Sequence, residues 1–60
     1  MYLRVMEKED RSKTEVIKVT AVELNALVNK LYFVIEGYPD VVETFILDTD
    51  KVYLITDKRA

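Results

Sequence analysis

Hydrophobic and polar residues alternate in two short segments near the N-terminus. In the segment 2–7, YLRVME, Leu3 and Val5 fall on one side of an extended chain. The segment 14–19, TEVIKV, is rich in β-branched residues and alternates in the same way. The run KEDRSK at 8–13 is polar throughout, as is typical of a hairpin loop. The N-terminal third of the chain therefore predicts two antiparallel strands.

The stretch from Thr20 to Gly37 carries helix signals at both of its ends. Thr20 and Glu23 have the spacing of a capping box, in which two side chains satisfy free backbone N–H groups at the start of a helix. Gly37 suits the left-handed position just after a helix, and Pro39 cannot continue one. We therefore predict a helix over residues 21–36.

The predicted helix has two apolar stripes. The broad stripe, which would pack on a sheet, consists of Leu24, Leu27, Val28, Leu31, Val34 and Ile35. A second stripe, on a different side, consists of Val22, Ala26 and Phe33. A helix that covers one sheet needs only one apolar face, so the second stripe indicates a docking surface. On this interpretation Phe33→Asp weakens a dimer and leaves the protomer folded.

An alternative interpretation shortens the helix. The residues at 31–35, LYFVI, are aromatic and β-branched enough to form a strand, with the residues at 37–40 as a turn. The helix would then end near Lys30, and residues 31–36 would form a fifth strand.

Two more strands are predicted in the C-terminal third, at 41–47 and 52–56. The tetrapeptide DTDK at 48–51 between them has the composition of a turn. If Asp48 pairs with Lys51, both faces of the resulting hairpin are largely apolar. One helix covers only one of these faces, and the face left over carries Thr44, Ile46, Tyr53 and Ile55.

Together these elements predict one α+β domain over residues 1–60, in the order β-β-α-β-β, with the helix packed on one face of an antiparallel sheet. The expected core alternates along the strands and follows the broad stripe of the helix. It consists of Leu3, Val5, Ile17, Val19, Leu24, Leu27, Val28, Leu31, Ile35, Phe45, Leu47, Val52 and Leu54.

Composition adds an expectation of self-association. The chain has 60 residues, of which 50% are hydrophobic, and it contains neither Cys nor His. Chains of this size usually supplement a thin core with disulfides, a metal or oligomerisation, and the first two lack their usual ligands here. We therefore expect a homodimer. The candidate contact residues are those on the two unpartnered apolar faces: Val22, Ala26, Phe33, Thr44, Ile46, Tyr53 and Ile55.

The sequence disfavours an enzyme, a metal site and a cofactor. Ser12 is the only serine, and no histidine is present to activate it. Asp48 and Asp50 are explained by turn chemistry, and a single glycine does not make a phosphate loop. No apolar run approaches the roughly 20 residues of a membrane span. We expect a cytoplasmic, non-enzymatic module that binds protein and has a regulatory role.

Two electrostatic alternatives remain open. A nucleic-acid-binding protein would use the basic and aromatic residues of the first hairpin, namely Tyr2, Arg4, Lys8, Arg11, Lys13 and Lys18. A net charge of −2 and interleaved acidic residues disfavour it. An acidic protein that imitates a polyanion, and so inhibits a nucleic-acid enzyme, would use Asp40, Glu43, Asp48, Asp50 and Asp57.

Overall fold

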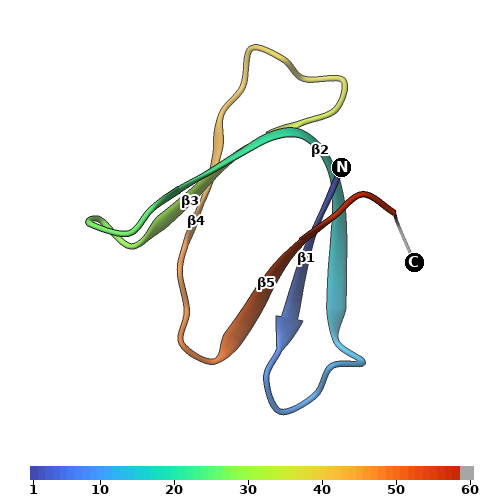
Figure 1. Cartoon of the computed structure of the whole chain (residues 1–60), viewed down its shortest axis with the longest axis vertical. Helices are drawn as coiled ribbons and strands as arrows, with labels where there is room; N and C mark the ends of the chain where they lie inside the picture. Colours follow the sequence, from blue (N-terminus) through green and yellow to red (C-terminus); the bar gives the residue numbers. More distant parts are fainter. Residues whose placement is uncertain (59–60) are drawn as a thin grey trace.

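The protein folds as a single antiparallel sheet of five strands. The structure, a computed structural model, describes residues 1–58. The strands are β1 (Tyr2–Glu7), β2 (Thr14–Asn25), β3 (Lys30–Ile35), β4 (Glu43–Ile46) and β5 (Lys51–Thr56) (Figure 1). These residues contain no helix, so the predicted α+β fold is wrong and the domain is all-β. In particular, none of residues 1–58 lies in a helix long and apolar enough to cross a membrane.

The strand order is β4-β3-β2-β1-β5, and every neighbouring pair is antiparallel. The long strand β2 belongs to both halves of the sheet. Its first part pairs with β1 and its second part with β3, and the register shifts between Val19 and Ala21. An irregularity of this kind bends a strand. Figure 1 shows β2 turning there, so that the β1–β5 half and the β3–β4 half lie at an angle to each other.

The predicted helix fails because its residues form two strands and the loop between them. Leu24 and Leu31 lie seven positions apart, a spacing that suits one helix face. The same two residues are directly opposite each other in the β2–β3 ladder, where Glu23 also faces Tyr32. Pairing with β3 thus takes the place of the predicted capping box at Thr20. The alternative of a fifth strand at 31–36 agrees with β3, but the shortened helix before it is absent.

A four-residue loop, residues 26–29, joins β2 to β3. The N–H of Asn29 donates to the carbonyl oxygen of Ala26 over 3.3 Å, and Asn29 has a φ of 56°. Asn tolerates this left-handed conformation better than most residues do. At the tip of the loop Leu27 is 98% exposed and Val28 is 51% exposed. Both were expected in the core of a helical protein, and both lie outside it because the tip extends beyond the sheet.

The chain reverses again at Gly37, between β3 and β4. Gly37 has a φ of 92°, and the N–H of Tyr38 donates to the carbonyl oxygen of Ile35 over 3.0 Å. A positive φ at the third position of a turn requires glycine or a similar residue. Gly37 therefore has the backbone conformation that the sequence suggested, but in a turn between strands and not after a helix.

The two C-terminal strands do not form the predicted hairpin. The turn itself is present, because the N–H of Lys51 donates to the carbonyl oxygen of Asp48 over 3.1 Å. However, β4 pairs with β3 and β5 pairs with β1, and no ladder joins β4 to β5 within residues 1–58. Strand β4 ends and strand β5 begins at this turn, and the two strands diverge from it (Figure 1).

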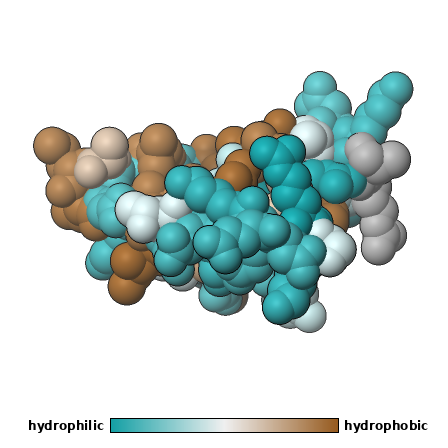
Figure 2. Space-filling model, turned by 90° about the horizontal axis from the view of Figure 1, so that it is seen from below, coloured by the Kyte–Doolittle hydropathy of each residue, from teal (hydrophilic) through white to brown (hydrophobic). Residues whose placement is uncertain are grey.

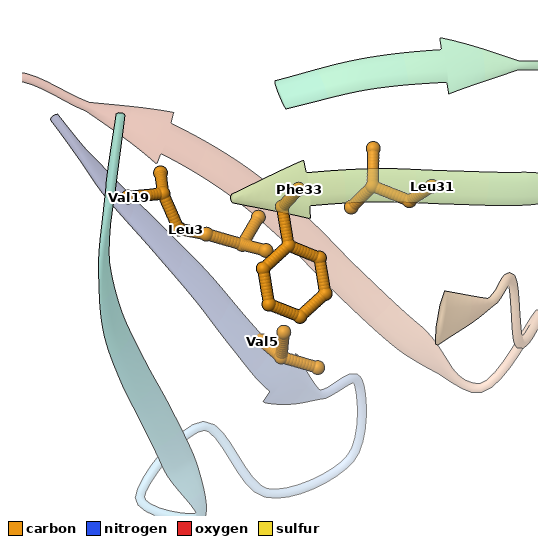
Figure 3. Packing of buried hydrophobic residues seen from close by; sticks show 5 residues of the cluster. All are labelled: Leu3, Val5, Val19, Leu31 and Phe33. Carbon is orange, nitrogen blue, oxygen red and sulfur yellow. The ribbon is translucent and has the colours of Figure 1, made fainter. Parts of the chain in front are cut away.

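The core lies between the two halves of the bent sheet. Leu3 and Val5 come from β1, Val19 from β2, and Leu31 and Phe33 from β3, and all five are buried (Figure 3). Because side chains from β1 and β3 belong to one cluster, the sheet is curved around them. Partly buried side chains complete the core: Ile17, Val22, Ile35, Phe45, Leu47 and Tyr53.

Four predicted core residues are exposed, namely Leu24 (60%), Leu27 (98%), Val28 (51%) and Leu54 (43%). Leu54 is opposite Arg4 on the outer face of the sheet, and Val52 is opposite Met6 on that face and only half-buried. The neighbouring Tyr53 faces Val5 and reaches the core. The β1–β5 register therefore reverses the assignment of faces that the predicted C-terminal hairpin gave to β5.

Candidate interaction surface

The five-stranded sheet curves into a barrel that does not close. Within residues 1–58 strands β4 and β5 form its two edges; no ladder joins them, and the turn at residues 47–50 connects them along the chain. An apolar groove of about 290 Å³ opens on the concave face. Its walls come from both halves of the sheet and consist of Leu3, Leu24, Leu31, Leu47, Tyr53 and Ile55. The concave face thus carries apolar side chains that the chain itself leaves partly uncovered.

The strand registers explain why these residues share the groove. Leu3 is directly opposite Ile55, and Leu24 is directly opposite Leu31. Directly opposed residues of an antiparallel pair point to the same face. In each pair one residue is buried and the other is exposed, since Leu3 and Leu31 are 0% and 5% exposed whereas Ile55 and Leu24 are 56% and 60% exposed. The exposed residue of each pair therefore leaves apolar surface uncovered in the groove.

Strand β4 has a neighbouring strand on one side only among residues 1–58, so backbone groups on its other side have no strand to pair with there. The N–H of Leu47 donates to the carbonyl oxygen of Asn29 over 2.9 Å, and these two residues extend the β3–β4 ladder by one step. In an antiparallel ladder, the residues that bond the neighbour alternate with residues that do not. Leu47 bonds toward β3, so the backbone groups of Thr44 and Ile46 point away from β3. They lie at the open side of the barrel.

A similar bond at the start of β5 shows which of its backbone groups point away from β1. The N–H of Lys8 donates to the carbonyl oxygen of Asp50 over 2.9 Å, which extends the β1–β5 ladder. Alternation then directs the backbone groups of Tyr53 and Ile55 away from β1. Both edges of the open barrel therefore carry backbone groups that a further strand could pair with.

The two edge strands differ in how well their side chains protect them against pairing with another chain. Edge strands of soluble proteins often carry lysine or proline, which discourages pairing with other chains. Strand β5 begins with Lys51, whose ammonium group lies 4.0 Å from the carboxylate of Glu7. The segment 41–47, VVETFIL, contains neither lysine nor proline, and its one charged residue is Glu43. Next to it Val42 is 63% exposed, and Ile46 on β4 is 73% exposed. The β4 edge is the less protected of the two.

Figure 2 shows how hydropathy is distributed over the side seen from below in Figure 1. Apolar residues gather at the left, where Figure 1 places the tip of the β2–β3 hairpin, and along the upper rim. The nearer surface is mostly hydrophilic and corresponds to the loops at the bottom of Figure 1. On the side that Figure 2 shows, most of the apolar residues thus lie away from the hydrophilic loops.

The predicted self-association residues fall into two groups. Phe33, from the predicted helix stripe, is buried, and Val22 from that stripe and Tyr53 from the predicted hairpin face are partly buried and pack against the core. The helix that would have displayed Val22, Ala26 and Phe33 together does not exist. The remaining candidates are exposed and lie on separate elements: Ala26 in the loop at 26–29, Thr44 and Ile46 on β4, and Ile55 on β5.

The sequence did not indicate Val42, Leu24 or Leu47 as surface candidates. Val42 precedes β4 and is exposed, and Leu24 and Leu47 line the groove. The mainly apolar character of VVETFIL, in which Glu43 and Thr44 are the polar residues, was the available signal for Val42. Its meaning depended on knowing that β4 lies at an edge, which only the strand order shows.

Three of the six candidate nucleic-acid-binding residues lie on the same face of the sheet. Tyr2 is directly opposite Lys18 on the outer face, which Arg4 shares. The ammonium nitrogen of Lys18 lies 5.9 Å from the centroid of the Tyr2 ring and 2.9 Å from a carboxylate oxygen of Glu36. The hydrogen bond from Lys18 to Glu36 raises the pKa of the Lys18 amine, with smaller contributions from the charges of Glu36 and Tyr2. Lys18 is therefore already engaged by an acidic residue of the same chain.

The other three basic candidates, Lys8, Arg11 and Lys13, lie in the β1–β2 loop. That loop is held by local bonds, in which the carboxylate of Asp10 accepts from the N–H of Ser12 over 3.1 Å. A hollow of about 310 Å³ beside it is lined by Val5, Met6, Glu7, Ser12, Lys13, Thr14, Glu15 and Lys51. The lining includes the acidic Glu7 and Glu15 and the basic Lys13 and Lys51, so neither sign of charge prevails there.

The acidic candidates are distributed over several elements. Asp40 lies in the β3–β4 loop and Glu43 begins β4, whereas Asp57 follows β5. Asp48 and Asp50 lie in the turn between β4 and β5, where the carboxylate of Asp48 accepts a hydrogen bond from the N–H of Asp50 over 2.8 Å. This bond supports the turn role that the sequence suggested for Asp48.

Comparisons with protein-family models, with curated proteins and with solved structures found no match for this chain.

Proposed function

We propose that the protein is a small non-enzymatic binding module that acts as a homodimer, with a regulatory role in the cytoplasm. The observation that carries this proposal is the unclosed barrel. Its concave face has an apolar groove, and its two edge strands lack neighbours on one side within residues 1–58.

Two physical arguments support self-association. Unpaired strand edges and contiguous exposed apolar side chains are both unfavourable in water, and a second copy can cover both at once. The protomer is also thin, with extents of 34 × 30 × 14 Å, and its fully buried side chains are limited to Leu3 and Val19 in the part of the chain that is described. So small a core rarely supplies more than about 3–5 kcal/mol of stability, and a dimer contact adds to it.

The oligomeric state tests this proposal directly. Sedimentation equilibrium from low to high micromolar protein should give a mass that approaches twice that of the chain. The melting temperature should rise with protein concentration, because association stabilises only the folded state. A protein that stays monomeric at high micromolar concentration, with a melting temperature independent of concentration, would contradict the proposal.

A further inference from the structure

We propose that the two copies join by antiparallel pairing of β4 with β4 of the second copy, about a two-fold axis that passes through Thr44. This inference rests on the proposed function, because it assigns the surface through which the homodimer forms. The joined sheets would make one continuous ten-stranded sheet from two five-stranded ones.

The backbone supports this register. The N–H and C=O groups of Thr44 and Ile46 point away from β3. Val42 immediately precedes β4, and an alternation continued by one residue would give its backbone groups the same direction. When Thr44 faces Thr44 of the second copy, Val42 faces Ile46 of that copy. All three residues then form hydrogen-bonded pairs, so the outward groups of each copy meet the outward groups of the other.

The side chains support the same register. In the β3–β4 ladder Ile46 is opposite Lys30 and Thr44 is opposite Tyr32, on the outer face of the sheet. The proposed register extends this strand by one residue, so that Val42 would lie on the same face. Ile46 and Val42 are 73% and 63% exposed, and the proposed register places each of them against the other across the axis, twice per dimer. Such apolar cross-strand pairs, with a Thr–Thr pair between them, are favourable in antiparallel sheets.

Neighbouring two-fold registers are less favourable. A register centred on Glu43 places this residue directly opposite Glu43 of the second copy, which puts like charges together. A register centred on Phe45 places Phe45 opposite Phe45 of the second copy and leaves Val42 opposite Asp48 of that copy. The register centred on Thr44 avoids both arrangements and pairs Glu43 with Phe45 of the second copy.

The position of β4 also favours it over β5. An added strand beside β4 lies on the open side of the barrel, next to Phe45 and Leu47, which are only partly buried. On β5 the edge begins with Lys51, and a charged ammonium group there disfavours strand addition. A two-fold contact uses the same edge of both copies, so it closes as a dimer and leaves no β4 edge for further growth.

Disulfide trapping tests the register, since the chain has no cysteine of its own. In a hydrogen-bonded antiparallel pair the Cα atoms are about 5.5 Å apart, which lies within the range that a disulfide spans. Thr44→Cys should therefore give a covalent dimer under mild oxidation at micromolar concentration. Leu54→Cys is the matched control, because Leu54 is 43% exposed on the outer face of the other edge strand. It should give at most the slow cross-linking of random collision.

A second pair of variants tests the contact without a covalent bond. Ile46→Lys places a charge at two symmetric sites of the proposed interface and should weaken dimerisation at least about tenfold, measured as the dissociation constant by sedimentation. Leu54 also lies on the outer face, but on β5, so Leu54→Lys should leave that constant unchanged. Two-dimensional NMR spectra of the variants establish that each protomer remains folded.

The outcomes separate this inference from the proposed function. Selective trapping of Thr44→Cys, with weakened association of Ile46→Lys, would support both. Three results would overturn the β4 contact and leave the homodimer standing. They are a dimer that Thr44→Cys does not trap selectively, one that Ile46→Lys does not weaken, and one that Leu54→Lys weakens as much as Ile46→Lys does. A wild-type protein that is monomeric throughout would overturn both.

Discussion

The phenol oxygen of Tyr53 accepts a hydrogen bond from the backbone N–H of Asp48, with 3.1 Å between the two atoms. The Tyr53 ring also lies near that of Phe45, with 6.2 Å between ring centroids. One side chain of β5 therefore contacts both the turn and the apolar side of β4. It does so where the two edge strands separate, and so it helps to fix the shape of the barrel opening.

Tyr53→Phe removes this hydrogen bond and keeps the ring. We expect a loss of about 0.5–1.5 kcal/mol in the free energy of unfolding, toward the lower end because water reaches the bond. Urea denaturation measures it. Tyr38→Phe, in the β3–β4 loop at 63% exposure, should change stability less. Equal effects of the two variants would show that the Tyr53 bond adds nothing.

Phe33 should be essential to the fold of the protomer. It is 5% exposed and stacks on Phe45, with ring centroids 5.0 Å apart. Phe33→Ala should cost about 3–5 kcal/mol, which is the whole stability expected of so small a domain. Circular dichroism should then show a largely unfolded chain. The sequence-based expectation that Phe33→Asp spares the protomer is corrected accordingly, since a buried carboxylate costs still more. A folded Phe33→Ala protein would contradict the packing described here.

Leu27 and Leu31 should respond differently to the same substitution. Leu27→Ala, at the fully exposed hairpin tip, should change the free energy of unfolding by less than about 0.5 kcal/mol. Leu31→Ala, in the core at 5% exposure, should cost about 2–5 kcal/mol. A helix with both residues on its buried face would instead give comparable losses. Urea denaturation of the two variants therefore distinguishes the two folds.

The ion pair of Lys18 and Glu36 should add a small, pH-dependent stabilisation. The hydrogen bond to Glu36 raises the folded-state pKa of the Lys18 amine above its ordinary value of 10.5. The stabilisation is therefore complete below pH 10.5 and is lost as the pH rises through the raised pKa. The two side chains are 55% and 51% exposed, so salt should screen the effect.

The variant Glu36→Gln isolates this contribution. At neutral pH and low salt the wild-type protein should be slightly more stable than the variant, as measured by thermal unfolding. The difference should vanish at strongly alkaline pH, where Lys18 is neutral in both proteins. A difference that stays constant across this range would show that it has another cause.

Local patterns predicted several strands but not their arrangement. The strands at 2–7, 14–19 and 52–56 and the turn at 48–51 correspond to β1, the first part of β2, β5 and the turn before it. The continuation of β2 was missed because Leu24 and Leu31 satisfy two geometries. Seven positions apart, they share a helix face, and they also lie symmetrically about the loop at 26–29. In the folded sheet this hairpin also pairs with β1 and β4, and that information is not local.

The candidate surface was predictable only in part, for the same reason. Ile46 and Ile55 were both expected on one leftover face of a C-terminal hairpin. They are exposed, but Ile46 lies on the outer face opposite Lys30, whereas Ile55 lines the groove opposite Leu3. Ile46 and Ile55 lie on different faces of the sheet because β4 and β5 pair with different neighbouring strands. No alternation of residues within either strand carries that information.

The place of β1 between β2 and β5 has a consequence for the order of folding. Strands β1 to β4 join through consecutive hairpins, which close over short loops, but the β1–β5 ladder brings Tyr2 to Thr56 and Glu7 to Lys51. Closing nearly the whole chain has the largest entropic cost of any pairing here, so we expect this ladder to form last and to set the folding rate. Until it forms, β1 has an open edge beside Leu3, the most deeply buried side chain of the finished domain. The N-terminal strand is thus the first to be synthesised and among the last to be protected.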